Sequence, residues 1–230
     1  MKNIKITSLV LCLIVLYSFS TLTRKGRTAS DTLSLSVGGL ITDFSLRNVD
    51  NTDISLSQFK EAKGFIIVFT CNHCPTAQAY EERIKMLTAD YKDKSVQVVA
   101  ISPNDPLSVR LDELGYSDLS DSYDEMVQRA KEKAYNFPYL FDGTTQEVAN
   151  KYGPIATPHV FIFDMHRTLR YSGRIDDVED PKKTPKSFDT RKAIEDLLAD
   201  KRVEVEKTKT FGCSIKWVEK HTLANSEKEE

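Results

Sequence analysis

Two cysteines, Cys71 and Cys74, are the residues of this sequence best suited to chemistry. They follow the apolar run 65–69, which predicts a buried strand, and precede Pro75, which suits the first turn of a helix. At a helix start, free N–H groups and the positive end of the helix dipole favour a thiolate. Cys71 is therefore a candidate nucleophile, and Cys74 is the partner that can release it by forming a disulfide. Reversible dithiol chemistry is the leading hypothesis.

A zinc site is the competing interpretation of this spacing. A closed zinc site needs four ligands, commonly completed by a second cysteine pair or a histidine pair. The remaining cysteines and histidines are scattered and offer no second pair at ligand spacing: Cys12, Cys213, His73, His159, His166 and His221. We therefore expect no metal and no cofactor.

The two residues between the cysteines, Asn72 and His73, are candidates for tuning the redox potential. An imidazolium at His73 would lower the pKa of a neighbouring thiol, stabilise the reduced form and make the pair more oxidising. A solvent-exposed His73 without influence is the alternative. We expect Cys71 at the helix N-cap, exposed and with the lower pKa. Cys74 would lie one turn further in, more buried and with the higher pKa.

The elements around the cysteines predict a βαβ unit over residues 65–101. Its first strand, 65–70, is apolar almost throughout, as expected for a strand covered on both faces. A second buried strand follows at 96–101. Between the strands, residues spaced three and four apart form one apolar helix face: Ala77, Tyr80, Ile84, Leu87 and Tyr91.

Local patterns predict the remaining elements, and their alternation of strands and helices indicates an α/β fold. Short strands are expected at 40–46, 53–56 and 138–141, and an antiparallel hairpin at 160–163 and 169–172. Helices are expected at 145–152, at about 191–200, and up to about residue 134 behind a capping box at 122–125.

Composition limits the partners that this protein can have. With 230 residues, the chain is long enough for one domain with a sizeable core plus appendages. Hydrophobic residues make up 40% and charged residues 29%, which indicates a soluble globular protein. The net charge of -2 and the pI near 6.1 come without a basic stripe interleaved with aromatic residues. A nucleic-acid partner is therefore not expected.

The order of these elements resembles the thioredoxin fold, and within it the redoxin branch of AhpC/TSA-like, peroxiredoxin-related families. The resemblance covers roughly residues 36 to 200 and rests on three motifs, at 43–46, 68–75 and 152–161. It implies a three-layer α/β fold, in which helices flank a central mixed β-sheet with an N-terminal β extension. Thr157-Pro158 matches the family's cis-proline loop, which lies against the dithiol and pairs its backbone with the substrate.

The sequence also departs from the patterns of the resembled families. Peroxiredoxins carry Thr or Ser three residues before the peroxidatic cysteine. In this sequence, the residue three before Cys71 is Val68, and the residue three before Cys74 is Cys71 itself. Phe65 stands in place of the buried acid of thioredoxins, and Ala77 in place of a reductase glutamate. Neither cysteine thus has the peroxidatic setting, and proton transfer at Cys74 lacks its usual relay.

The function that we infer from the sequence is a thiol–disulfide oxidoreductase. Cys71 attacks the disulfide of a protein substrate, Cys74 resolves the mixed disulfide, and an unidentified redox partner restores the pair. A thiol peroxidase that also uses Cys71 is the alternative enzyme. A non-catalytic interaction domain that keeps only the thioredoxin fold is the alternative from another class.

Segments outside the central fold are assigned from their composition. We expect a signal peptide at 1–20, a linker at 21–35, a thioredoxin-like domain at 36–203 and a charged extension, frayed near its end, at 204–230. The signal peptide predicts export to the periplasm or another extracytoplasmic space. An uncleaved N-terminal membrane anchor is the alternative.

Cys213 in the C-terminal extension is the odd cysteine of the exported protein. It is either a third redox centre that exchanges with Cys71 and Cys74, or a small apolar residue buried beneath Phe211 and Trp217. The sequence slightly favours the buried interpretation.

Overall fold

The computed structural model describes residues 35–114, 119–180 and 183–218. The predicted signal peptide, the predicted linker up to residue 34, Cys12 and the last twelve residues of the predicted extension, 219–230, lie outside the described residues. Within the described part, no helix has both the length and the apolar character needed to cross a membrane.

The central strand β3 (Gly64–Phe69) ends just before the dithiol. All six of its residues are buried, as predicted for a strand covered on both faces. It pairs in parallel with β4 (Val96–Ser102) and antiparallel with β6 (His159–Asp164). The predicted parallel pair is confirmed, and the sheet is mixed.

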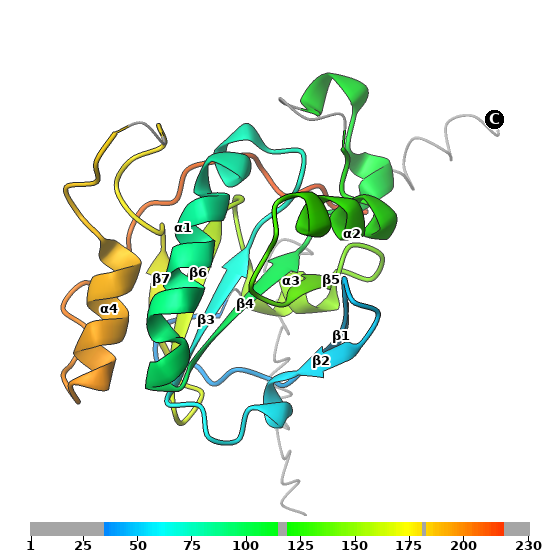
Figure 1. Ribbon diagram of the computed structural model, residues 1–230. Coiled ribbons are helices and arrows are strands. Elements are labelled where there is room, and N and C mark those ends of the chain that lie inside the picture. The colour runs from blue at the N-terminus through cyan, green and yellow to red at the C-terminus, as the bar shows by residue number, and fades with distance from the viewer. Residues whose placement is uncertain (1–34, 115–118, 181–182, 219–230) are drawn as a thin grey trace, which may run out of the picture. The chain divides into compact units, whose positions relative to one another are not determined.

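The sheet has seven strands in the order β2-β1-β5-β4-β3-β6-β7 (Figure 1). The N-terminal β extension consists of β1 (Ser45–Asn48) and β2 (Asp53–Ser55), and β1 joins the sheet by antiparallel pairing with β5 (Tyr139–Phe141). At the other side, β7 (Leu169–Gly173) pairs antiparallel with β6, which confirms the predicted hairpin.

The first strand begins five residues later than predicted. Leu40, where the prediction began, makes only an isolated bridge with Thr168. The Asp43 carboxylate accepts the backbone N–H of Phe44 and that of Leu56, each at 2.9 Å. These local bonds fold the chain before β1, because an aspartate side chain competes with strand pairing for backbone donors.

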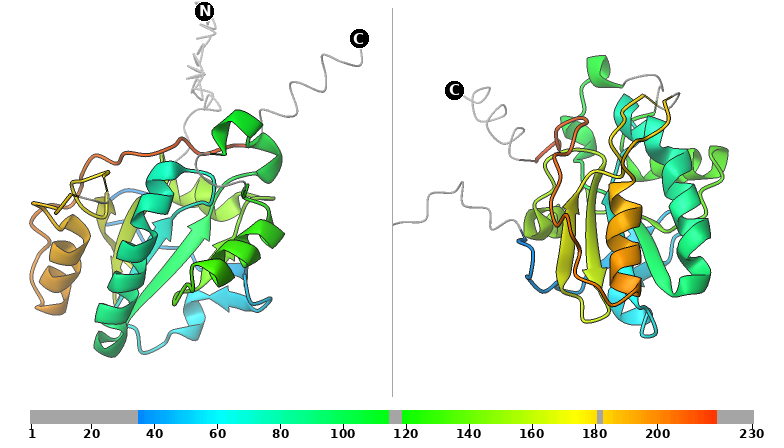
Figure 2. Two further views of the ribbon diagram at one scale, coloured as in Figure 1. Left: turned by 45° about the horizontal axis from the view of Figure 1, so that its top comes forward. Right: turned by 90° about the vertical axis from the view of Figure 1, so that its left-hand side faces the viewer.

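Helices cover both faces of the sheet (Figures 1 and 2). The core of the described residues has two large hydrophobic clusters. The helices α1 (Pro75–Tyr91), α2 (Tyr123–Glu132) and α4 (Asp189–Leu198) contribute buried residues to the first, and α3 (Glu147–Tyr152) contributes to the second. Short 3₁₀ helices lie in the connections: η1 (Leu56–Gln58), η2 (Lys92–Lys94), η3 (Pro106–Ser108) and η4 (Leu111–Glu113). The three-layer α/β architecture is as predicted, and it is thioredoxin-like.

The start of α2 follows its sequence signal. The Ser122 side chain accepts the backbone N–H of Glu125, and the Glu125 carboxylate accepts the backbone N–H of Ser122. The predicted capping box is confirmed. Because it fixes the chain direction at the helix start, it also fixes the position of the preceding residue, Asp121.

The chain after α4 is folded, and we call residues 203–218 the C-terminal strap. Val203, Ile215 and Lys216 are buried. The strap runs from the side of α4 past the ends of the central strands (Figure 2, orange to red). The predicted fraying near the chain end lies outside the described residues, while the part of the charged extension up to residue 218 is folded, because apolar residues set among the charges bury against the domain.

Candidate active site at the amino end of α1

The helix that carries the dithiol starts at a different residue from the one predicted. α1 begins at Pro75, so Cys74 is its N-cap, and Cys74 Sγ accepts the backbone N–H of Ala77 at 3.5 Å. Proline favours the first helical position, which makes the preceding residue the cap. The expectation that Cys71 occupies the N-cap is therefore wrong.

Both sulfurs are buried, but in unlike surroundings. The exposed fraction is 4% for Cys71 and 0% for Cys74. Thiol donors at Cys213 and Cys71, helped by the N–H groups of Ala77 and Cys213, lower the pKa of Cys74 far below that of an ordinary thiol. Burial, together with hydrogen bonding to Cys74 and the charge of Asp121, raises the pKa of Cys71. These opposite shifts in pKa favour ionisation of Cys74 over Cys71, the reverse of the expectation.

The Thr157-Pro158 loop faces both cysteines. Its peptide bond is cis, as predicted. Thr157 Oγ1 lies 3.1 Å from Cys71 Sγ, and the Thr157 carbonyl lies 3.3 Å from Cys74 Sγ. The loop is therefore placed to contact whatever reaches the sulfurs, and its role in substrate binding stays a prediction.

His73 is buried and paired, which excludes the solvent-exposed alternative. Its exposed fraction is 1%, and Nδ1 lies 2.6 Å from Asp121 Oδ2. Because a carboxylate only accepts, Nδ1 donates its hydrogen to Asp121, and in the neutral ring the free lone pair is then on Nε2. Nε2 is buried and has no hydrogen-bond partner among the described residues. The imidazole is therefore equipped to accept a proton.

Asp121 is the organising carboxylate of the site. It is fully buried, and its Oδ1 accepts the backbone N–H of Asn72 at 2.7 Å and that of His73 at 3.2 Å. Its Oδ2 accepts Asn104 Nδ2 at 2.7 Å as well as the His73 ring. The sequence did not identify Asp121 as a site residue, because no local pattern around it indicates a contact with His73, 48 residues away.

Asn72 is a structural anchor of the loop between the cysteines. Its Nδ2 donates to Ser120 O at 2.8 Å, and its Oδ1 accepts the Tyr139 hydroxyl at 3.2 Å. Its carbonyl accepts Gln78 Nε2 at 2.6 Å. These bonds hold the loop against its neighbours. Asn72 would therefore influence the sulfurs indirectly, by fixing the position of the loop.

The ligand atoms of Cys71, His73 and Asp121 lie within 4.8 Å of one another, close enough to share a metal ion. A carboxylate offers about four lone-pair directions. Four donors already fill those of Asp121. Metal binding would require displacing at least one of them, so the arrangement fits a proton relay better than a metal centre.

Cys213 lies beside the dithiol. Its backbone N–H donates to Cys74 Sγ at 3.3 Å, and the residue is half-buried. Phe211 packs instead against Tyr80, at 6.2 Å between ring centroids, and Trp217 against a different core cluster. The slightly favoured interpretation, a cysteine buried beneath Phe211 and Trp217, is wrong.

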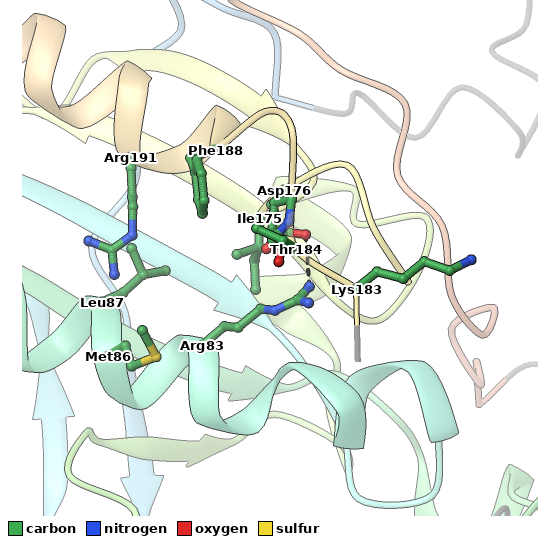
Figure 3. Close-up of a pocket in the computed structure, with 10 residues that line it drawn as sticks. Arg83, Met86, Leu87, Ile175, Asp176, Lys183, Thr184, Phe188 and Arg191 are labelled. Atoms are coloured by element: carbon green, nitrogen blue, oxygen red, sulfur yellow. Dashed lines mark hydrogen bonds and ion pairs between the residues drawn. The ribbon is translucent and has the colours of Figure 1, made fainter. Parts of the chain in front are cut away.

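A separate cavity of about 250 Å³ opens between α1 and the segment before α4 (Figure 3). Arg83 pairs with Asp176 at its edge, with 2.8 Å between Nη1 and Oδ1. No cysteine lines this cavity, so it belongs to the packing of the helices and not to the dithiol site.

Comparison with known proteins places these features in a family context. Residues 37–172 match the model of the AhpC/TSA family. A search of curated proteins finds no match.

Solved structures give the same fold over most of the chain. A hypothetical protein from Sinorhizobium meliloti 1021 is 30% identical with a TM-score of 0.71, and the match covers 80% of this chain and 96% of that chain. An uncharacterized conserved protein from Geobacillus kaustophilus is 34% identical with a TM-score of 0.69, and the match covers 80% of this chain and 93% of that chain. The C-terminal domain of a candidate thiol-disulfide oxidoreductase from Bacteroides thetaiotaomicron is 16% identical with a TM-score of 0.53, covering 72% and 97%.

Proposed function

This chain belongs to the AhpC/TSA family, and from that membership we propose that it is a thiol–disulfide oxidoreductase acting on protein disulfides. One observation carries the proposal: Cys74 Sγ lies at the N-cap of α1 and accepts the N–H groups of Ala77 and Cys213, in a cluster that includes Cys71. An ionised sulfur beside a second thiol is the chemical requirement for forming and breaking a disulfide reversibly.

Cys71 makes the first attack, because it is the residue of the pair with residual exposure, 4% against 0% for Cys74. A ring nitrogen of His73 lies within 4.8 Å of Cys71 Sγ without a hydrogen bond to it, so the ring takes the proton of Cys71 through a small movement or an intervening water, while Asp121 orients the ring. The Cys71 thiolate forms a bond to one substrate sulfur, and the other substrate sulfur leaves as a thiolate. The product of this step is a mixed disulfide.

Cys74 completes the exchange. Its thiolate attacks the Cys71 sulfur, the bond to the substrate breaks, and a Cys71–Cys74 disulfide remains. In the opposite direction, the low pKa of Cys74 makes it a good leaving group. Because the stabilised thiolate exists only in the reduced protein, the pair should favour the oxidising direction.

A thiol peroxidase is the second candidate. The family match and the thiolate at Cys74 favour it. Against it, Cys71 takes the position three residues before Cys74 where peroxiredoxins carry Thr or Ser. We also propose that the protein acts outside the cytoplasm. The apolar run at 6–20 behind Lys2 and Lys5 supports this location, which makes protein disulfides available as substrates.

The first experiment compares two substrates for the reduced protein. We expect reduction of a protein disulfide, followed by gel shift of its free thiols, to proceed faster than consumption of hydrogen peroxide. The double variant Cys71→Ser/Cys74→Ser is the matched blank. Fast peroxide turnover without disulfide exchange would establish the peroxidase instead. Inactivity toward both substrates would favour the third interpretation, a non-catalytic interaction domain.

A second prediction concerns His73→Gln. Without the proton acceptor, disulfide reduction at neutral pH should slow by about a hundredfold or more, in the range of lost general-base catalysis. The pH–rate profile should lose the limb that reports proton transfer to the ring. His166→Gln, on the exposed turn between β6 and β7, is the matched control and should behave as the wild type. An unchanged profile in His73→Gln would remove the ring from the mechanism.

A further inference from the structure

Backbone hydrogen bonds fix the C-terminal strap on both sides of Cys213. On the amino side, Thr208 N donates to Ser172 O of β7 at 3.1 Å. On the carboxyl side, Lys216 N donates to Asn104 Oδ1 at 2.9 Å. The thiol between these anchors is therefore held by the fold and does not lie on a free tail.

The strap approaches the Thr157-Pro158 loop more closely than a side chain at position 212 would allow. Gly212 has a φ of +138°, and a Cβ there would lie 2.0 Å from Thr157 O. The next residue, Cys213, accepts the backbone N–H of Thr157 at 2.9 Å. Glycine at 212 thus brings Cys213 onto the same backbone segment that contacts Cys74.

The three described thiols form one cluster. Cys71, Cys74 and Cys213 pack together with Ala77, and the Cys213 N–H donates to Cys74 Sγ at 3.3 Å. Cys74 packs against Cys71, and its sulfur accepts the Cys213 N–H, so it is in contact with both of the other residues. A sulfur with a thiol on either side can form a disulfide with either neighbour.

We propose that Cys213 is a third redox centre, which replaces Cys71 as the disulfide partner of Cys74. The inference rests on the proposed dithiol function. The Cys213 thiolate attacks the Cys74 sulfur of the Cys71–Cys74 disulfide. The Cys74–Cys213 bond forms, the Cys71–Cys74 bond breaks, and Cys71 leaves as a thiolate that takes up the proton lost by Cys213. The exchange moves no net electrons, so it needs no further oxidant.

The state of Cys74 controls when Cys213 reacts. In the reduced protein, hydrogen bonding to Cys74, burial and the charge of Cys74 raise the pKa of Cys213. Once Cys74 enters a disulfide, its negative charge is gone and this stabilisation of the Cys213 thiol is lost. The other nearby charges, Lys216 and Glu113, oppose each other. Oxidation of the dithiol therefore activates Cys213.

Disulfide mapping of the Cys71→Ser variant tests the proposal. The reduced variant is exposed to oxidised glutathione well below the roughly millimolar effective concentration of an intramolecular thiol. After acid quenching, alkylation and proteolysis, mass spectrometry should identify a Cys74–Cys213 disulfide as the main product. A mixed disulfide of Cys74 with glutathione, with Cys213 alkylated, would overturn the proposal.

A displaced thiol supplies the matched control. In Cys71→Ser/Cys213→Ser/Ser214→Cys, the thiol moves one residue along the strap to an exposed position. Its disulfide with Cys74 should be at least about tenfold less abundant, a difference of about 1.4 kcal/mol. Equal abundance would mean that the strap merely samples many positions, and the proposal fails.

The wild type separates this proposal from the function on which it rests. Under the same oxidant it should yield the Cys71–Cys74 disulfide, together with the Cys74–Cys213 disulfide. The wild type could form only the Cys71–Cys74 disulfide while the variant forms only the glutathione adduct. That result would contradict the proposed role of Cys213 and leave the dithiol function intact. A wild type that forms no disulfide among these cysteines would remove the dithiol function itself.

Discussion

Cys74→Ser should turn the protein from a catalyst into a trap. Cys71 and the His73–Asp121 pair beside it are unchanged, so the first attack on a substrate disulfide still occurs. Without the Cys74 thiolate, the mixed disulfide is not resolved. Turnover should fall by at least about a thousandfold, as when a residue of a covalent mechanism is removed. Mass spectrometry should find the substrate joined to Cys71.

Cys71→Ser and Cys213→Ser are the controls for the trap. Cys71→Ser should lose turnover and accumulate no protein adduct, because a large substrate cannot bring its disulfide to the buried Cys74, which small glutathione can reach. Cys213→Ser keeps both residues of the dithiol and should accumulate no adduct either. Accumulation in Cys71→Ser instead would assign the first attack to Cys74 and reverse the two roles.

Asp121→Asn should produce the largest loss of stability. The carboxylate is fully buried and accepts four hydrogen bonds, and an amide of the same shape has one acceptor atom and adds two donors. Breaking a buried charged pair typically costs about 3–5 kcal/mol of unfolding free energy. Urea denaturation should show this as a lower midpoint with an unchanged slope.

The neighbouring carboxylate supplies the control for Asp121. Asp124 is exposed in the first turn of α2, so Asp124→Asn loses only a surface interaction with the helix dipole. Its cost should stay below about 1 kcal/mol. If Asp121→Asn were as mild as Asp124→Asn, the carboxylate would not hold the loop between the cysteines. That result would also contradict the proposed proton transfer through His73, which depends on Asp121 orienting the ring.

Sequence patterns predicted the elements whose burial repeats along the chain. The helix face of Ala77, Tyr80, Ile84, Leu87 and Tyr91 is buried throughout. In β3, alternate residues face two different cores, with Ile66 and Val68 on one and Phe65, Ile67 and Phe69 on the other. Such periodicities follow from the geometry of a helix or a strand and can be read without tertiary contacts.

The site was predictable only where a motif is local. The dithiol and the Thr157-Pro158 loop could be identified because each is a short segment, and the loop was recognised by resemblance. The N-cap was misplaced by three residues, although Pro75 itself carries the signal for Cys74.

Other parts of the site depend on contacts that sequence spacing does not encode. Asp121 meets His73 across 48 residues, and Cys213 meets Cys74 across 139. The burial of His73 and the fold of the C-terminal strap follow from these meetings. The charged composition of the strap gave no indication that it packs on the domain, although a few buried apolar residues are sufficient to dock it.

The bridge between Ser172 and Lys207 has a consequence for behaviour at high concentration. It covers part of β7, the outermost strand on that side, while the outermost strand on the other side, β2, has only three residues. Unpaired strand edges are the template on which proteins aggregate by adding strands from another molecule. With one edge partly covered and the other short, the protein offers little backbone for such growth, so concentrated solutions should resist fibril formation.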